Sequence, residues 1–131
     1  MIVIDTSALV AILDEEPDAS RYAEAIAEAD ALLISAATLL ETGIVILNRR
    51  GPKGAQKLHA LLQEAGCQVE SVTPQHADVA LEAYASYGKG QKSKAGLNYG
   101  DCFSYALART TGLPLLFKGK DFAGTDIQPA L

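Results

Sequence analysis

Four acidic residues stand at points in the sequence where carboxylates are chemically useful. Asp5 directly follows the apolar run IVI, and Glu41 lies in the first turn of the helix expected after the run LLIS. Asp101 opens the amphipathic stretch DCFSYALART, and Asp121 follows the run PLLF. Carboxylates that lie close together raise one another's pKa, and a hard divalent cation such as Mg²⁺ or Mn²⁺ relieves this repulsion. A bound ion of this kind lowers the pKa of a water and stabilises charge on a phosphoryl oxygen.

Each acid also has a purely structural explanation. Asp5 is suited to cap the helix that follows it. Glu41 stands three residues after Thr38, which is the spacing of a capping box. Asp101 precedes a helical stripe, where an acid caps the helix or complements its dipole, and Asp121 follows a glycine as turn residues do. The chemical interpretation therefore depends on whether the fold brings the four acids together.

Apolar runs alternate with amphipathic segments along the chain, which predicts strands alternating with helices. Strands are expected at residues 2–5, 32–35, 68–72 and 114–117, with a weak fifth near Ile127. Helices are expected at residues 7–13, 17–29, 38–50, 53–65, 74–85 and 101–110. This alternation predicts an α/β fold in which helices cover both faces of a parallel sheet of four to five strands.

The expected topology places all four acids at one edge of this sheet. In such folds the chemistry lies beyond the carboxyl ends of the strands. The helix that begins at Asp101 leads into the fourth strand, so it runs antiparallel to the strands and its N-terminus lies at the same edge. The ~12 residues from 87 to 98 extend up to ~40 Å, enough to return past the ~18 Å helix before them. The sequence thus predicts a metal-dependent hydrolase that acts on phosphodiesters.

Composition is that of an ordinary globular protein. The 131 residues are 49% hydrophobic and 21% charged, which favours one domain over residues 1–131 with a sizeable core. The two cysteines, Cys67 and Cys102, lack the spacing of a disulfide framework or a zinc site. No apolar run approaches the ~20 residues needed to span a membrane, and no secretion signal is evident. We expect a cytoplasmic protein without a membrane contact.

The motifs around the four acids resemble those of the PIN-domain ribonucleases, and most closely the VapC-type toxins of type II toxin–antitoxin systems. The resemblance covers nearly the whole chain, through the segments IVIDTSALVAIL, SAATLLETGIVI, GDCFSYALA and LLFKGKDFAGTDI. It implies a three-layer α/β/α sandwich and Mg²⁺- or Mn²⁺-dependent cleavage of RNA by an activated water, leaving a 5′-phosphate. It further implies a cognate antitoxin that covers the active site, and a homodimer.

The resemblance also implies a role for individual residues. Asp5 and Asp101 correspond to direct metal ligands, Glu41 to a residue that holds metal or orients the water, and Asp121 to one that acts through water or a second ion. Ser7 corresponds to a small hydroxyl residue that hydrogen-bonds a ligand carboxylate or a substrate phosphate, although N-capping explains it equally well. Together, Asp5, Glu41, Asp101 and Asp121 form the expected catalytic and metal-binding set.

Basic residues near these acids are candidates for contact with RNA. The net charge of −5 disfavours a nucleic-acid partner at first sight, but much of the negative charge belongs to the expected ligands. Lys89, Lys92 and Lys94 occupy the loop leading to Asp101. Lys120 departs from the family pattern, in which a polar or small residue precedes the fourth acid, and it could pair with that acid or contact a phosphate.

Other functions fit the sequence less well. A phosphorylated receiver domain needs an acceptor aspartate after the third strand, where this chain has SVTP, and a haloacid-dehalogenase-like phosphatase needs a second acid at position 7, which is Ser7. The alternative from another class is a catalytically inactive PIN module that binds a protein or RNA. For partner binding, the apolar face of residues 39–47 is a candidate contact for an antitoxin or a second copy of the chain, although burial in the core competes.

Overall fold

The four apolar runs form one parallel sheet in the computed structural model, which describes all residues from 1 to 131. The strands are β1 (Ile2–Ile4), β2 (Leu32–Ser35), β3 (Gln68–Glu70) and β4 (Leu115–Leu116), in the order β3-β2-β1-β4. Val3 of β1 pairs with Leu33 of β2 on one side and with Leu115 of β4 on the other. β1 is therefore an interior strand, and strands flank its carboxyl end on both sides.

Five helices connect and cover the strands. They are α1 (Thr6–Leu13), α2 (Ala19–Glu28), α3 (Ala36–Glu64), α4 (Pro74–Tyr87) and α5 (Tyr99–Thr111). α3 consists of two helices that meet at Gly51, whose φ of 68° only glycine adopts without strain. This break lies where the sequence predicted one helix to end and the next to begin.

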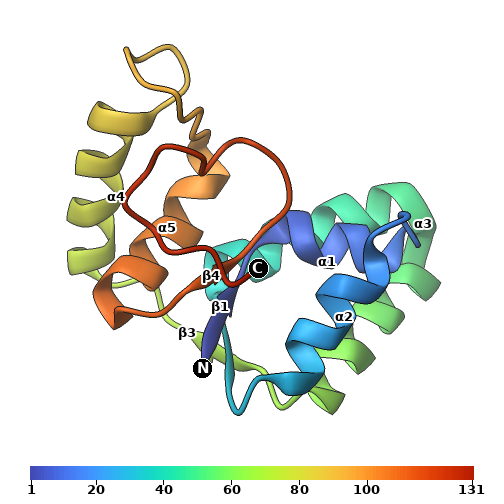
Figure 1. Ribbon diagram of the computed structural model, residues 1–131. Coiled ribbons are helices and arrows are strands. Elements are labelled where there is room, and N and C mark those ends of the chain that lie inside the picture. The colour runs from blue at the N-terminus through green and yellow to red at the C-terminus, as the bar shows by residue number, and fades with distance from the viewer.

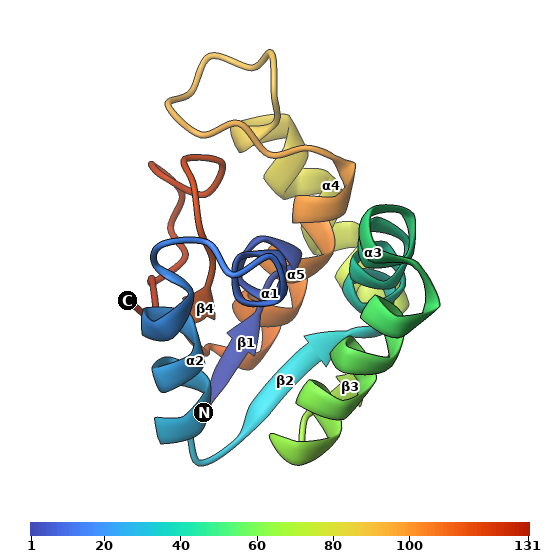
Figure 2. The same cartoon turned by 90° about the vertical axis from the view of Figure 1, so that its right-hand side faces the viewer.

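The helices lie on both faces of the sheet (Figures 1 and 2). One core packs sheet residues such as Val3 and Leu115 against α4 and α5. The second core packs Ile4 and Leu116 against α1, α2 and the second half of α3. Adjacent residues of one strand thus enter opposite cores, as the alternation of side chains along a strand requires. The predicted α/β/α sandwich around a parallel sheet is confirmed.

Several element boundaries differ from the prediction. α3 begins at Ala36, because the Ser35 hydroxyl accepts a hydrogen bond from Ala37 N at 3.3 Å and caps the helix. Thr38 is therefore a buried residue inside the helix, and its predicted capping box with Glu41 is wrong. The expected fifth strand is also wrong, since only an isolated bridge between Leu115 and Pro129 extends the sheet there. No helix is both long and apolar enough to span a membrane.

Candidate active site

The structure places the four predicted acids around the carboxyl edge of the sheet. Asp5 directly follows β1 and is only 3% exposed. Asp101 lies in the first turn of α5 and is 8% exposed. Glu41 lies in the second turn of α3 and is half-buried, whereas Asp121 is exposed in the loop after β4. The site is thus built from one strand end, two helices and one loop.

Three hydrogen bonds fix the Asp5 carboxylate. Its Oδ2 accepts from the Ser7 backbone N–H at 3.0 Å and from the Ser7 hydroxyl at 2.7 Å, and the first of these bonds caps α1. Its Oδ1 accepts from the Ser104 hydroxyl of α5 at 2.6 Å. Asp5 therefore serves as a helix cap, as the structural explanation proposed, and still points one oxygen toward α5. Because a carboxylate oxygen has more than one acceptor site, these bonds leave it able to bind a cation.

Asp101 is held by a capping box at the start of α5. The Asn98 side chain accepts from Asp101 N at 2.8 Å, and Asp101 Oδ2 accepts from Asn98 N at 3.0 Å. The pKa of Asp101 is raised to about 8, mainly by burial and further by the neighbouring carboxyl groups of Asp121 and Asp5, against the lowering effect of the Asn98 bond. Asp5 and Asp121 therefore both lie close enough to Asp101 to affect its carboxyl group electrostatically.

Glu41 reaches the same region from α3. Its Oε1 accepts a hydrogen bond from the Thr6 hydroxyl at 2.8 Å. Its Oε2 lies against the backbone of Gly100, where an added Cβ would come within 2.1 Å of that oxygen. The glycine next to Asp101 thus leaves the space that the Glu41 carboxylate occupies between α3 and α5.

The donor set suits a hard divalent cation. None of the ion pairs in the structure involves Asp5, Glu41, Asp101 or Asp121, so no basic side chain neutralises their charge. Carboxylate oxygens are what Mg²⁺ and Mn²⁺ prefer, and a cation would offset both the burial of the Asp101 charge and its repulsion by the neighbouring acids, which together raise the pKa of Asp101. As the side chains stand, no three acids, histidines or cysteines already form a group that could hold a metal ion. The residue types and charges fit such an ion, and binding requires some of these carboxylates to turn toward a common centre.

The predicted RNA-contacting lysines are all exposed. Lys89, Lys92 and Lys94 lie in the loop between α4 and α5, which projects from the molecule (Figures 1 and 2). This loop packs against the segment that carries Asp121, because Gly96 N donates to Asp121 O at 3.0 Å. Lys120 is exposed and forms no ion pair, so the pairing with Asp121 considered for it is absent.

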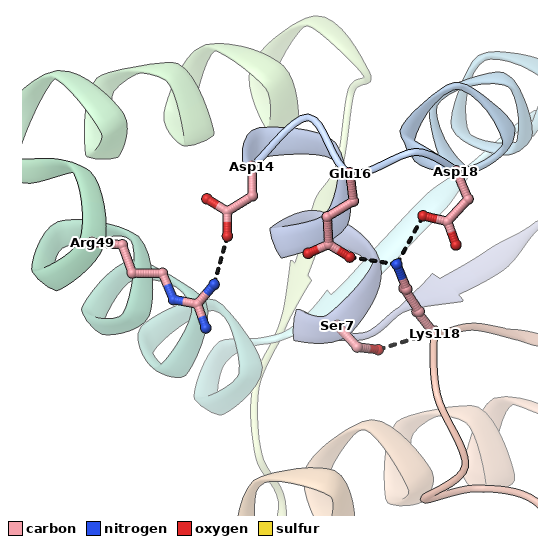
Figure 3. Close-up of polar contacts among 6 residues, drawn as sticks. All are labelled: Ser7, Asp14, Glu16, Asp18, Arg49 and Lys118. Atoms are coloured by element: carbon pink, nitrogen blue, oxygen red, sulfur yellow. Dashed lines mark hydrogen bonds and ion pairs between the residues drawn. The ribbon is translucent and has the colours of Figure 1, made fainter.

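Lys118 differs from these lysines because its side chain is engaged by acids (Figure 3). Its Nζ contacts the carboxylates of Glu16 and Asp18, the latter at 2.9 Å, and both contacts raise the pKa of Lys118. Its backbone N–H donates to the Ser7 hydroxyl at 2.9 Å. In the same view Arg49 binds Asp14 at 2.5 Å. The Lys118 contacts tie the segment after β4 to α1 and to the turn between α1 and α2, whereas the Arg49 contact joins α3 to the end of α1.

The hydroxyl groups that connect the acids were not predicted from the sequence. Thr6 contacts Glu41, while Thr38 and Ser104 lie 3.2 Å apart and Ser104 binds Asp5. One signal was available for Ser104, since it stands three residues after Asp101 and therefore faces the same side of α5. Thr38 lacked such a signal, because its partner is distant in sequence.

The sequence matches the PIN domain family over residues 2–128. It is 54% identical over 127 residues to ribonuclease VapC30 of Mycobacterium tuberculosis, covering 96% of this chain and 95% of that protein. It is 52% identical over 126 residues to ribonuclease VapC of Mycolicibacterium smegmatis, covering 96% and 97%.

Two solved structures share the fold at low sequence identity. The crystal structure of Mycobacterium tuberculosis VapC20, described as a sarcin–ricin loop cleaving toxin, superposes with a TM-score of 0.79 at 20% identity, covering 97% of this chain and 96% of that one. A toxin–antitoxin complex from Klebsiella pneumoniae superposes with a TM-score of 0.74 at 19% identity, covering 100% and 98%. The family match and the close relatives confirm the resemblance seen in the sequence motifs, and the chain belongs to the PIN-domain family and, within it, to the VapC ribonucleases.

Proposed function

We propose that the protein is an endoribonuclease that hydrolyses RNA phosphodiester bonds with Mg²⁺ or Mn²⁺ and acts as the toxin of a toxin–antitoxin pair. The observation that carries the proposal is the group of acids at the carboxyl edge of the sheet, where none is ion-paired and Asp101 has a strongly raised pKa. The close VapC ribonuclease relatives support the same activity.

Each acid receives a role in this proposal. Asp5 and Asp101 hold the divalent ion, which when bound supplies an activated water and stabilises charge on the phosphoryl oxygen. Glu41 holds the ion or orients the attacking water, and Asp121 acts through water or a second ion. Because the Ser7 N–H and hydroxyl both bind Asp5 Oδ2, Ser7 holds this oxygen of the carboxylate in place.

RNA approaches this site past the exposed lysines. Lys89, Lys92 and Lys94 supply positive charge on the loop that packs beside the Asp121 segment, and Lys120 adds a fourth cation at the same side. Contacts of this kind neutralise phosphates without reading sequence, so they favour binding of the RNA backbone. Because RNA and the cognate antitoxin are both made in the cytoplasm, we place the protein there as well.

We assign the apolar groove of α3 to protein partners, the cognate antitoxin or a second copy of the chain. Leu40, Ile44 and Leu47 are 65%, 51% and 49% exposed, whereas Ile46 of the same helix is fully buried. Core packing therefore does not use this face of α3. Leu58 and Leu62 of the second half of α3 complete the groove.

A cleavage assay tests the proposed activity. Purified protein with Mg²⁺ or Mn²⁺ is expected to cut RNA, and both excess EDTA and Asp101→Asn are expected to abolish cutting. Equal activity in the variant or in EDTA would indicate contamination and refute the proposal. Sequencing the RNA ends after induced expression identifies the substrate.

The inactive-module alternative has no support from the relatives, which are named ribonucleases. This alternative predicts that the protein, free of antitoxin, cleaves no RNA whichever metal is added. Co-expression with the neighbouring reading frame tests the toxin–antitoxin pairing separately. Failure of this protein to copurify with the product of the neighbouring reading frame would count against the pairing but would not contradict the nuclease activity.

A further inference from the structure

We propose that Ser104 is a positioning residue that fixes the Asp5 carboxylate for metal binding and couples it to the two helices that carry Glu41 and Asp101. The inference rests on the proposed function, because it assigns Asp5 to the metal site. Ser104 touches neither solvent nor substrate, since only 1% of it is exposed. Its effect on the reaction must therefore pass through Asp5.

The direction of the hydrogen bonds supports this role. Ser104 Oγ lies 2.6 Å from Asp5 Oδ1, which as an ionised carboxylate oxygen can only accept a hydrogen bond. The single hydroxyl proton of Ser104 is therefore donated to Asp5. Thr38 Oγ1 lies 3.2 Å from Ser104 Oγ, so the Thr38 hydroxyl donates to Ser104. The result is a directed chain of hydroxyl groups, Thr38 to Ser104 to Asp5, in which every proton has an acceptor.

This chain joins three separate elements at the edge of the sheet. Thr38 belongs to α3, Ser104 to α5, and Asp5 connects β1 to α1. α3 also carries Glu41, and α5 also carries Asp101. Because all three members are buried, water cannot replace a missing partner cheaply. The relative position of the three acids therefore depends on Ser104, which bonds to both neighbours.

Loss of the hydroxyl leaves Oδ1 of Asp5 without its buried donor. The Ser7 bonds to Oδ2 remain, so the carboxylate stays capped to α1 but gains freedom to rotate about its own axis. Removing such a partner from a metal-ligating group typically lowers metal affinity ~10- to 100-fold. Ser104→Ala removes one oxygen atom and is otherwise small enough for the buried position.

Titration of metal-free protein with Mn²⁺ by calorimetry is the test, with the wild type measured first. We expect the Kd for Mn²⁺ to rise at least ~10-fold in Ser104→Ala. In RNA cleavage kcat is expected to fall at saturating metal, while KM stays unchanged because Ser104 does not contact RNA. Ser104→Thr, which restores a hydroxyl, is expected to recover most of the affinity.

The matched control is Thr111→Ala, which removes a hydroxyl from the same helix where it bonds only to the backbone oxygens of Leu107 and Ala108. This control is expected to keep the wild-type Kd. A Kd in Ser104→Ala within twofold of the wild type would overturn the inference, as would equal loss in Ser104→Thr and Ser104→Ala when both remain folded by circular dichroism. Failure of the wild type itself to bind Mn²⁺ would instead refute the proposed function.

Discussion

Replacing Asp101 by asparagine is expected to abolish RNA cleavage and at the same time to stabilise the metal-free protein. Asparagine has nearly the shape of aspartate, and its side-chain oxygen can still accept the hydrogen bond from Asn98 N that Asp101 Oδ2 accepts at 3.0 Å. The substitution therefore keeps the capping box of α5. What it removes is a buried carboxyl group with other carboxylates as neighbours.

The size of the stabilisation follows from the raised pKa of Asp101. Folding moves this pKa from an ordinary 3.8 to about 8, so at pH 7 the folded protein retains a proton that the unfolded chain has lost. Each pKa unit between 3.8 and the solution pH corresponds to about 1.4 kcal/mol, which sets an upper limit of roughly 4 kcal/mol at pH 7. The contribution of Asp101 to stability is greatest below pH 3.8 and declines as the pH rises toward 8.

Urea denaturation in EDTA at several pH values between 5 and 8 measures this effect. The free energy of unfolding of the wild type is expected to fall with rising pH relative to that of Asp101→Asn, by up to about 1.4 kcal/mol per pH unit. Adding Mn²⁺ is expected to reduce the difference in the free energy of unfolding between Asp101→Asn and the wild type, because the ion stabilises only the wild type, which binds it. A variant no more stable than the wild type at pH 8, with a parallel pH dependence, would refute the raised pKa and the crowding of acids inferred from it.

Three further outcomes follow from the structure. Gly100→Ala is expected to displace the Glu41 carboxylate, because the new Cβ would lie 2.1 Å from Glu41 Oε2. A cleavage assay should show at least ~10-fold loss of activity, while the circular dichroism spectrum stays unchanged. Asn98→Ala removes the cap of α5 and is expected to cost about 1 kcal/mol in urea denaturation and to lower activity through Asp101; unchanged stability would contradict the capping geometry. Burial raises the pKa of Cys67 to about 11, so its thiol should react with a thiol reagent at pH 8 far more slowly in native than in urea-unfolded protein, and equal rates would exclude that burial.

Local sequence patterns were sufficient to predict the fold. The apolar runs before Asp5 and around Leu115 form strands because both faces of the sheet are covered, and the break at Gly51 ends a helix because glycine adopts its positive φ without strain. The convergence of the acids followed from one topological rule, that parallel strands end at a common edge.

Contacts between distant segments could not be predicted in the same way. Ser104 binds Asp5 from 99 residues away, and Lys118 binds Glu16 from 102 residues away, so no local spacing announces either pair. The cap of α3 was misassigned because Ser35 and Thr38 are both good capping residues, and only the burial of Thr38 between α3 and α5 distinguishes them.

The pairing of β1 with β4 bears on when the protein becomes able to act. Val3 and Leu115 are neighbours in the sheet although they stand near opposite ends of the 131-residue chain. Contacts between such distant segments form late, because the chain between them must first be ordered. During synthesis the first strand leaves the ribosome long before its partner, and domains fold as units once their last element has emerged. We therefore expect the acidic edge to remain unassembled on the nascent chain until β4 has left the ribosome, so that the nascent chain cannot cleave RNA before that point.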